Sequence, residues 1–266
     1  MPERLQLRAS AAQRLSTPTP RVFYINDDLT DEVRAAAGTD SEVARLIDAL
    51  FDLLRRDGER VVILTERQQL DALMARGPFP PFSLALGLGR AGERVAQRVH
   101  AHTGWFPAIR RVEIAREEDG SGGYRLVTGS EPLVVQLAAT DAATSLAVVD
   151  DTVFSGLTMR SVLLALSPAA RTRARAFCLR AVAETLQTVE ALCPVTAGIV
   201  APGRILDDVS FINASGLVRR GAIRRAGQRP LAFFERAEWM RAWFPGYAEE
   251  VTRLCRELNA RLPPPA

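Results

Sequence analysis

The chain has 266 residues, of which 47% are apolar and 24% charged, so it can form one large α/β domain with an appended subdomain. The formal net charge of +3 is too small to indicate a nucleic-acid-binding protein. The sequence has no lysine and 34 arginines, so any cationic clamp on a phosphate or pyrophosphate must use guanidinium groups.

The cysteines and the amino terminus favour a reducing compartment. Cys178, Cys193 and Cys255 lie far apart without metal-ligand spacing, which is typical of free thiols. Residues 1–14 are polar and carry arginines, without the apolar segment of a secretory signal. No apolar run approaches the ~20 residues that a membrane span needs. We therefore expect a cytoplasmic protein with no membrane or nucleic-acid partner.

The first eighty residues predict two strands and two helices. Apolar residues from Val43 to Leu54 recur at helical spacing after Ser41 or Asp40, either of which can cap the helix. A proline cluster at 77–81 is the best internal boundary. The expected elements are a strand at 21–25, a helix over about 41–54, a strand at 60–64 and a helix at 66–75.

Beyond the proline cluster, strands alternate with helices of about ten residues, a pattern that predicts a parallel sheet. The expected strands are at 82–86, 108–114, 146–149, 174–182 and 197–201, and the expected helices at 92–102, 157–166 and 184–192. Residues 116–123 predict a mobile loop, and 124–127 and 133–137 the arms of a hairpin. After residue 201 the pattern changes, with helices expected at 231–243 and 247–262.

One stretch carries chemistry. The run Leu146–Val149 predicts a buried strand, and Asp150 and Asp151 follow at its carboxyl end, where open α/β sheets bind ligands. The next loop offers hydroxyls and backbone N–H groups before a helix begins, which suits a phosphate. A buried strand that ends in a solvated Asp-Asp turn is the plainer alternative.

This stretch resembles the PRPP-binding signature of the type I phosphoribosyltransferases (PRPP is 5-phosphoribosyl 1-pyrophosphate). The resemblance lies in four apolar residues, two acids, three variable positions and then Ser-Gly-x-Thr. It implies a Rossmann-like parallel sheet in residues 81–201, covered by a hood from the terminal segments 1–80 and 202–266. It also implies that the acids contact the ribose and that the following loop binds the 5-phosphate through Thr152, Phe154, Ser155, Gly156, Leu157 and Thr158.

A second motif, Gly87-x-Gly89-x-x-Gly92, has two interpretations. It satisfies the dinucleotide-binding fingerprint, with Glu113 about 20 residues further on as the ribose acid. It is also similar to the pyrophosphate loop of the phosphoribosyltransferases, formed here by Gly89, Arg90, Ala91 and Gly92. The dinucleotide interpretation leaves Asp150 and Asp151 unexplained, so the two motifs together favour PRPP.

The resemblance implies a transferase that displaces pyrophosphate from PRPP with a nucleophile of a small acceptor. Mg²⁺ is the implied cofactor, held by Asp150 and Asp151 directly or through water. Arg90 and Arg116 are candidate pyrophosphate contacts, and residues 116–124 a candidate lid over the site. We expect the assembly to be a homodimer.

The acceptor is left to Phe154, Asp207 and Asp208 as candidate contacts, although the two acids also suit a capped surface turn. Phe154 and Leu157 depart from the residues common in purine-converting members, which weakens a hypoxanthine–guanine assignment. A hydroxyl or amine of a small metabolite is the expected nucleophile. Two other functions stay open, a regulator that binds PRPP or a nucleotide without catalysis and an NAD(P)-dependent oxidoreductase.

Overall fold

The structure, a computed structural model of the chain, describes residues 19–119 and 123–262. These residues form two parallel sheets, one antiparallel hairpin and the helices that cover them. The α/β class with parallel sheets is as the alternation of strands and helices predicts. Residues 1–18 of the predicted N-terminal segment, and 120–122 of the predicted mobile loop, lie outside the described residues.

The larger sheet has five strands, and every neighbouring pair in it is parallel. The run Leu146–Val149 in its middle strand is fully buried, as expected of a strand covered on both faces. We call residues 66–201 the core lobe. Across this sheet the strands follow the order β4 (Ile109–Val112), β3 (Leu84–Leu88), β7 (Leu146–Val153), β8 (Ala174–Val182) and β9 (Val195–Ala201).

Helices cover the two faces of the larger sheet. On one face α3 (Glu66–Met74) and α4 (Gly89–Thr103) pack over a cluster that includes Trp105 and Phe177. On the other face α6 (Leu157–Ala165) and α8 (Ala183–Glu190) bury Val162 and Val189. The short α5 (Leu133–Gln136), η1 (Ala138–Ala142) and α7 (Pro168–Thr172) lie in the connections.

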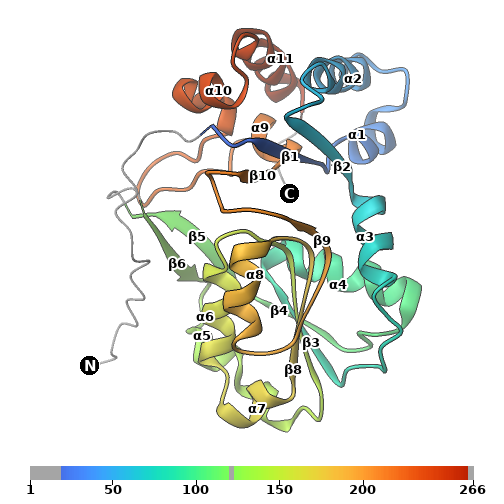
Figure 1. The fold of residues 1–266 in the computed structure, drawn as a ribbon, viewed down its shortest axis with the longest axis vertical. Coiled ribbons are helices and arrows are strands. Elements are labelled where there is room, and N and C mark those ends of the chain that lie inside the picture. The colour runs from blue at the N-terminus through green and yellow to red at the C-terminus, as the bar shows by residue number, and fades with distance from the viewer. Residues whose placement is uncertain (1–18, 120–122, 263–266) are drawn as a thin grey trace.

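The smaller sheet joins the two terminal segments. Its strands run parallel in the order β10 (Val209–Asn213), β1 (Val22–Asp27) and β2 (Val61–Thr65). Its helices are α1 (Thr30–Ala37), α2 (Glu42–Arg55), α9 (Ala214–Val218), η2 (Phe233–Glu235), α10 (Ala237–Trp243) and α11 (Ala248–Arg261). We call the described residues of 19–65 and 202–262 the terminal lobe. The two lobes are stacked along the longest axis of the molecule (Figure 1).

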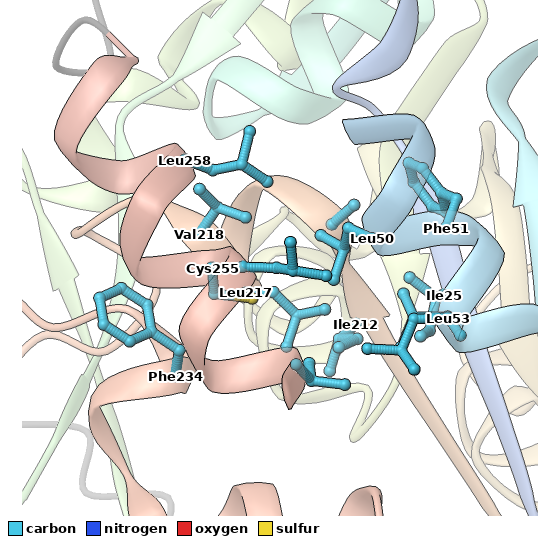
Figure 2. Close-up of a cluster of buried hydrophobic side chains, with 14 of the residues drawn as sticks. Ile25, Leu50, Phe51, Leu53, Ile212, Leu217, Val218, Phe234, Cys255 and Leu258 are labelled. Carbon is cyan, nitrogen blue, oxygen red and sulfur yellow. The ribbon is translucent and has the colours of Figure 1, made fainter. Parts of the chain in front are cut away.

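The terminal lobe has a hydrophobic core of its own. Helix α2 begins where predicted, with Ser41 Oγ accepting a hydrogen bond from Ala44 N at 3.1 Å. Its apolar face meets α11, so that side chains from residues 25–53 and 212–258 interleave, as Figure 2 shows for Leu50 and Leu258. Both terminal segments therefore contribute to one core.

The opposite face of the smaller sheet rests on the core lobe. Tyr24, Leu64 and Phe211 alternate in sequence with residues of the terminal core, and they pack with Val182 and Ala201 at the ends of β8 and β9. The period-2 alternation of the strands therefore divides their side chains between the two contacts. The carboxyl ends of β8 and β9 therefore meet this face of the smaller sheet at the junction of the two lobes.

The hairpin differs from the prediction. Its arms are β5 (Ile114–Glu118) and β6 (Tyr124–Thr128), so Arg116 lies in a strand and the expected strand at 108–114 is split. Residues 133–137, predicted as an arm, form α5 instead, after Pro132. Gln136 explains the outcome, because its buried amide bonds to Glu113 N (2.6 Å) and Glu113 O (3.3 Å) where β4 and β5 separate.

Two further predictions were wrong in part. The helix expected at 231–243 exists only as η2 and α10, since Leu231 pairs with Ile223 in a β-bridge. Strand β10, which follows Asp207 and Asp208, was not predicted at all. No helix in the described ranges, 19–119 and 123–262, is both long and apolar enough to cross a membrane.

Candidate functional site

The acid pair lies in the carboxyl-terminal half of β7, the middle strand of the larger sheet. Asp150 and Asp151 are within the strand rather than after it, because β7 continues its pairing with β8 through Thr152 and Val153. Asp151 N donates a hydrogen bond to Asp150 Oδ1 at 2.9 Å. The two carboxylates are thus held on a buried, paired backbone.

The loop after the acid pair is shaped by one glycine. Gly156 caps α6 with a φ of +70°, in the left-handed region that favours glycine. A Cβ there would lie 2.8 Å from Thr185 Cγ2. The chain therefore turns tightly from strand to helix, and the first N–H groups of α6 are left without intrahelical partners.

A small hollow of about 10 Å³ lies inside this turn, room for about one water. It is lined by Asp150, by residues 152–159 and by Arg116 from the hairpin. The structure thus brings together Arg116, one member of the acid pair and the whole predicted phosphate loop. These residues were predicted from two separate stretches of the sequence.

The two acids have different electrostatic surroundings. Burial, reinforced by the charge of Asp151, raises the pKa of Asp150 well above its ordinary value. Burial also acts to raise the pKa of Asp151, but the charge of Arg180 and a hydrogen bond from Thr152 outweigh it, so this pKa lies below its ordinary value. Asp151 is therefore the member of the pair that stays ionised more readily.

Arg180 is the residue of the site that the sequence analysis missed. It lies on β8, is 1% exposed, and donates from Nη2 to Asp151 Oδ2 at 3.0 Å. It also donates to Gln69 Oε1 at 2.8 Å and to Asn213 Oδ1 at 2.5 Å. The available signal was an arginine inside the apolar run of residues 176–182, a position where a charge needs a partner.

The glycine motif is not a loop. Gly89 to Gly92 form the first turn of α4, and only Gly89 has a positive φ, +61°. A Cβ on Gly92 would lie 2.3 Å from Val149 O, so this glycine lets α4 approach β7 one residue before Asp150. Arg90 is exposed in the same turn. Gly89 to Gly92, four of the predicted pyrophosphate residues, thus lie at a helix N-terminus, with Gly92 against the residue that precedes Asp150.

The predicted acceptor residues are separated. Phe154 is half-buried and packs edge-on against Phe211 at 6.5 Å between ring centroids, and Phe211 in turn stacks on Tyr24. Asp208 Oδ2 accepts from Arg204 N at 2.9 Å, and its carboxylate also pairs with Arg21. Asp207 pairs with Arg204 across the same exposed turn. Of the three, Phe154 alone lines the hollow.

Two other groups bear on ligand chemistry. Glu113, the candidate ribose acid of the dinucleotide interpretation, is half-exposed and paired with Arg111.

A cleft of about 290 Å³ lies between the carboxyl end of β1 and α4, lined by Asp27, Asp28, Asp31, Glu32, Ala35, Glu66, Arg94 and Arg98. Among the described residues, no three His, Cys, Asp or Glu side chains are arranged to hold a metal ion.

Comparison with known proteins gives structural similarities only. No family model matches the chain, and no curated protein matches its sequence. A purine phosphoribosyltransferase from Pyrococcus horikoshii is 16% identical over 56% of this chain and 91% of its own, with a TM-score of 0.36.

Two further solved structures are similar over about half of the chain. A hypothetical protein from Neisseria gonorrhoeae with bound ppGpp is 15% identical, with a TM-score of 0.38, over 55% of this chain and 81% of its own. The protein TT1426 from Thermus thermophilus is 21% identical, with a TM-score of 0.32, over 50% of this chain and 80% of its own.

Proposed function

We propose that the protein transfers the 5-phosphoribosyl group of PRPP to a small acceptor and releases pyrophosphate. The observation that supports this most is the arrangement around β7. A carboxylate pair on the middle strand is followed by a glycine turn into a helix, and an arginine from a separate hairpin lines the same hollow. The carboxylates suit the ribose hydroxyls of PRPP, the start of the helix suits its 5-phosphate, and the arginine suits its pyrophosphate.

The residues divide the substrate between them. Asp150 and Asp151 accept hydrogen bonds from the ribose hydroxyls. The backbone N–H groups at the start of α6, with Ser155 and Thr158, bind the 5-phosphate across the mouth of the hollow, where the helix dipole favours an anion. Arg116 and the first turn of α4, with Arg90, neutralise the departing pyrophosphate. Positioning and electrostatic stabilisation are then the protein's main contributions.

The acid pair also fits Mg²⁺. This ion prefers oxygen ligands and is usually held by one or two carboxylates together with substrate phosphates, which is compatible with a site of two protein acids. When bound with PRPP, the ion supplies charge neutralisation for the leaving group. Because the pKa of Asp150 is raised, its ionised form is the one that such a cation would stabilise most.

The acceptor side belongs to the terminal lobe in this proposal. Phe154 reaches from the phosphate loop to the aromatic pair of Phe211 and Tyr24, so the wall beside the loop is aromatic. The amides of Asn26 and Asn213 belong to this lobe too, and Asn213 is joined to Asp151 through Arg180. We infer a small acceptor with a nucleophilic hydroxyl or amine, rather than an ordinary purine.

The test is pyrophosphate release from PRPP and Mg²⁺ in the presence of pools of nucleobases, amines and alcohols. We expect release with at least one pool, and a loss of about 100-fold or more in Asp150→Asn and Asp151→Asn. Asp48→Asn, which changes a half-exposed acid on α2 that pairs with Arg34, is the matched control and keeps full activity. PRPP binding without release from any pool would support the regulator instead. Stabilisation by NAD(P) and not by PRPP would support the oxidoreductase.

A further inference from the structure

Arg180 is the centre of a buried polar network that joins the two lobes. Its guanidinium group bonds to Asp151 on β7, Gln69 on α3 and Asn213 at the end of β10. Asn26, at the end of β1, accepts from Gln69 Nε2 at 2.5 Å and donates to Asn213 Oδ1 at 3.4 Å. Arg180, Gln69, Asn26 and Asn213 therefore form a closed ring from four separate elements, and Asp151 is bonded to it through Arg180.

The geometry fixes one carboxylate oxygen. Asp151 Oδ2 accepts from Arg180 Nη2 at 3.0 Å and from Thr152 Oγ1 at 3.1 Å. Arg180 is a rigid planar fork, so its plane is set once Gln69 and Asn213 hold two of its edges. The orientation of this plane in turn sets the direction from which Arg180 Nη2 donates to Asp151.

A charge as deeply buried as Arg180 is costly unless it is paired and hydrogen-bonded. The core lobe supplies a counter-charge, Asp151, and an amide, Gln69. The terminal lobe supplies Asn213, which accepts from the same Nη2 nitrogen that bonds to Asp151. A shift of β10 would thus disturb the nitrogen that orients the acid.

We infer that Arg180 is a positioning residue for Asp151, and that Asn213 links the terminal lobe to this acid through it. The inference rests on the proposed function, since Asp151 is taken as a ribose contact. It assigns the terminal lobe a second role besides the acceptor wall. The placement of β10 determines how well the core lobe holds PRPP.

The experiment is calorimetric titration of the full-length protein with PRPP and Mg²⁺, using variants that leave Asp151 in place. Asn213→Ala removes the acceptor on Nη2, and Arg180→Lys keeps the charge but loses the fork. Asn259→Ala is the matched control, because Asn259 is likewise a half-buried asparagine of the terminal lobe, and its Nδ2 donates to Val218 O at 2.8 Å, away from the network. Circular dichroism checks that each variant is folded.

We expect Asn213→Ala and Arg180→Lys to weaken PRPP binding about tenfold, the equivalent of one buried hydrogen bond to a charged group. Asn259→Ala stays within about twofold of the wild type. In an Asp151→Asn background, Asn213→Ala has no further effect, because its influence passes through the carboxylate.

Several results would overturn the inference. The inference is wrong if Asn213→Ala and Arg180→Lys both bind PRPP with wild-type affinity. It is also wrong if Asn213→Ala weakens binding as much in the Asp151→Asn background as in the wild-type background. If Asn259→Ala lowers the affinity for PRPP as much as Asn213→Ala does, the cause is a general loosening of the terminal lobe and the inference is wrong. Failure of the wild-type protein itself to bind PRPP is a different result, because it rejects the proposed function and the inference with it.

Discussion

Gly156 is where the strand that carries the acid pair becomes helix α6, whose start we propose as the phosphate site. Its φ of +70° and the 2.8 Å that would separate a Cβ from Thr185 Cγ2 are two distinct obstacles to a side chain. Gly246 has a φ of +88° but open space around it, so it provides a control for the backbone term alone.

We expect Gly246→Ala to lower the free energy of unfolding by ~1–2 kcal/mol, the cost of a left-handed residue. Gly156→Ala should cost a further ~1–3 kcal/mol, since Thr185 must move. Urea denaturation of both variants measures the difference. Equal losses would mean that the turn has room for a methyl group and is not tightly fixed.

Asp28 gives a pH dependence that can be isolated. Its carboxylate accepts from Ser215 N at 2.8 Å and Ser215 Oγ at 2.5 Å, but burial outweighs these bonds and raises its pKa above the ordinary 3.8. The folded state then holds the proton more tightly than the unfolded state. The resulting stability is complete below the unfolded pKa and is lost as the pH rises through the folded one.

We therefore expect Asp28→Asn to become more stable relative to the wild type as the pH rises from about 4. The difference should level off above the folded pKa of Asp28. Urea denaturation of both proteins over a pH series gives this difference directly, because the other titrating groups cancel. A difference that is constant with pH would show that burial does not disfavour the charged form.

The candidate site residues that lie close together along the sequence were the ones that could be predicted from it. Asp150, Ser155 and Gly156 stand within seven positions of one another, so spacing alone relates them. Arg180 and Asn213 could not be found in this way, because they come from distant segments and their partners are settled only by packing. The direct pairing of Arg180 with Gln69 joins residues 111 positions apart.

At the scale of elements, α11 is the helix that closes the terminal lobe. Leu258 is fully buried against α2 and α9, while Arg256 on the same helix is exposed. Leu258→Ala should lower the free energy of unfolding by ~2–5 kcal/mol through lost burial and a cavity. Arg256→Ala should change it by no more than ~0.5 kcal/mol. Similar values for the two variants, measured by urea denaturation, would contradict the packing of α11 on this core.

Elements with strong local signals were predicted well. Ser41 and the apolar spacing after it specify α2, and the fully apolar Leu146–Val149 specifies the start of β7. Residues 133–137 failed because a β-branched run after Pro132 suits a strand or a short helix, and the choice depends on Gln136 reaching Glu113. The helical state of Gly89–Gly92 likewise depends on contact with Val149, which no local pattern contains.

At the scale of the whole molecule, one face of the smaller sheet meets the carboxyl ends of β8 and β9 in the larger sheet. The core lobe brings Asp150 and Asp151 to this junction, and the terminal lobe brings Asn26 and Asn213. The proline cluster at 77–81 indicated a boundary, yet α3 before it already packs on the larger sheet. The pairing of β1 with β10 was beyond prediction, because the two strands come from opposite ends of the chain.

The central claim is that this junction binds PRPP, and titration calorimetry with PRPP and Mg²⁺ tests it most directly. We expect saturable binding with a dissociation constant of ~1 μM to 1 mM, the usual range for enzyme substrates. Binding should be lost in the double variant Asp150→Asn/Asp151→Asn and kept in Asp48→Asn, with no heat from NAD⁺ or NADP⁺. The claim is contradicted if PRPP gives no heat with the wild-type protein, or binds equally well to the double variant.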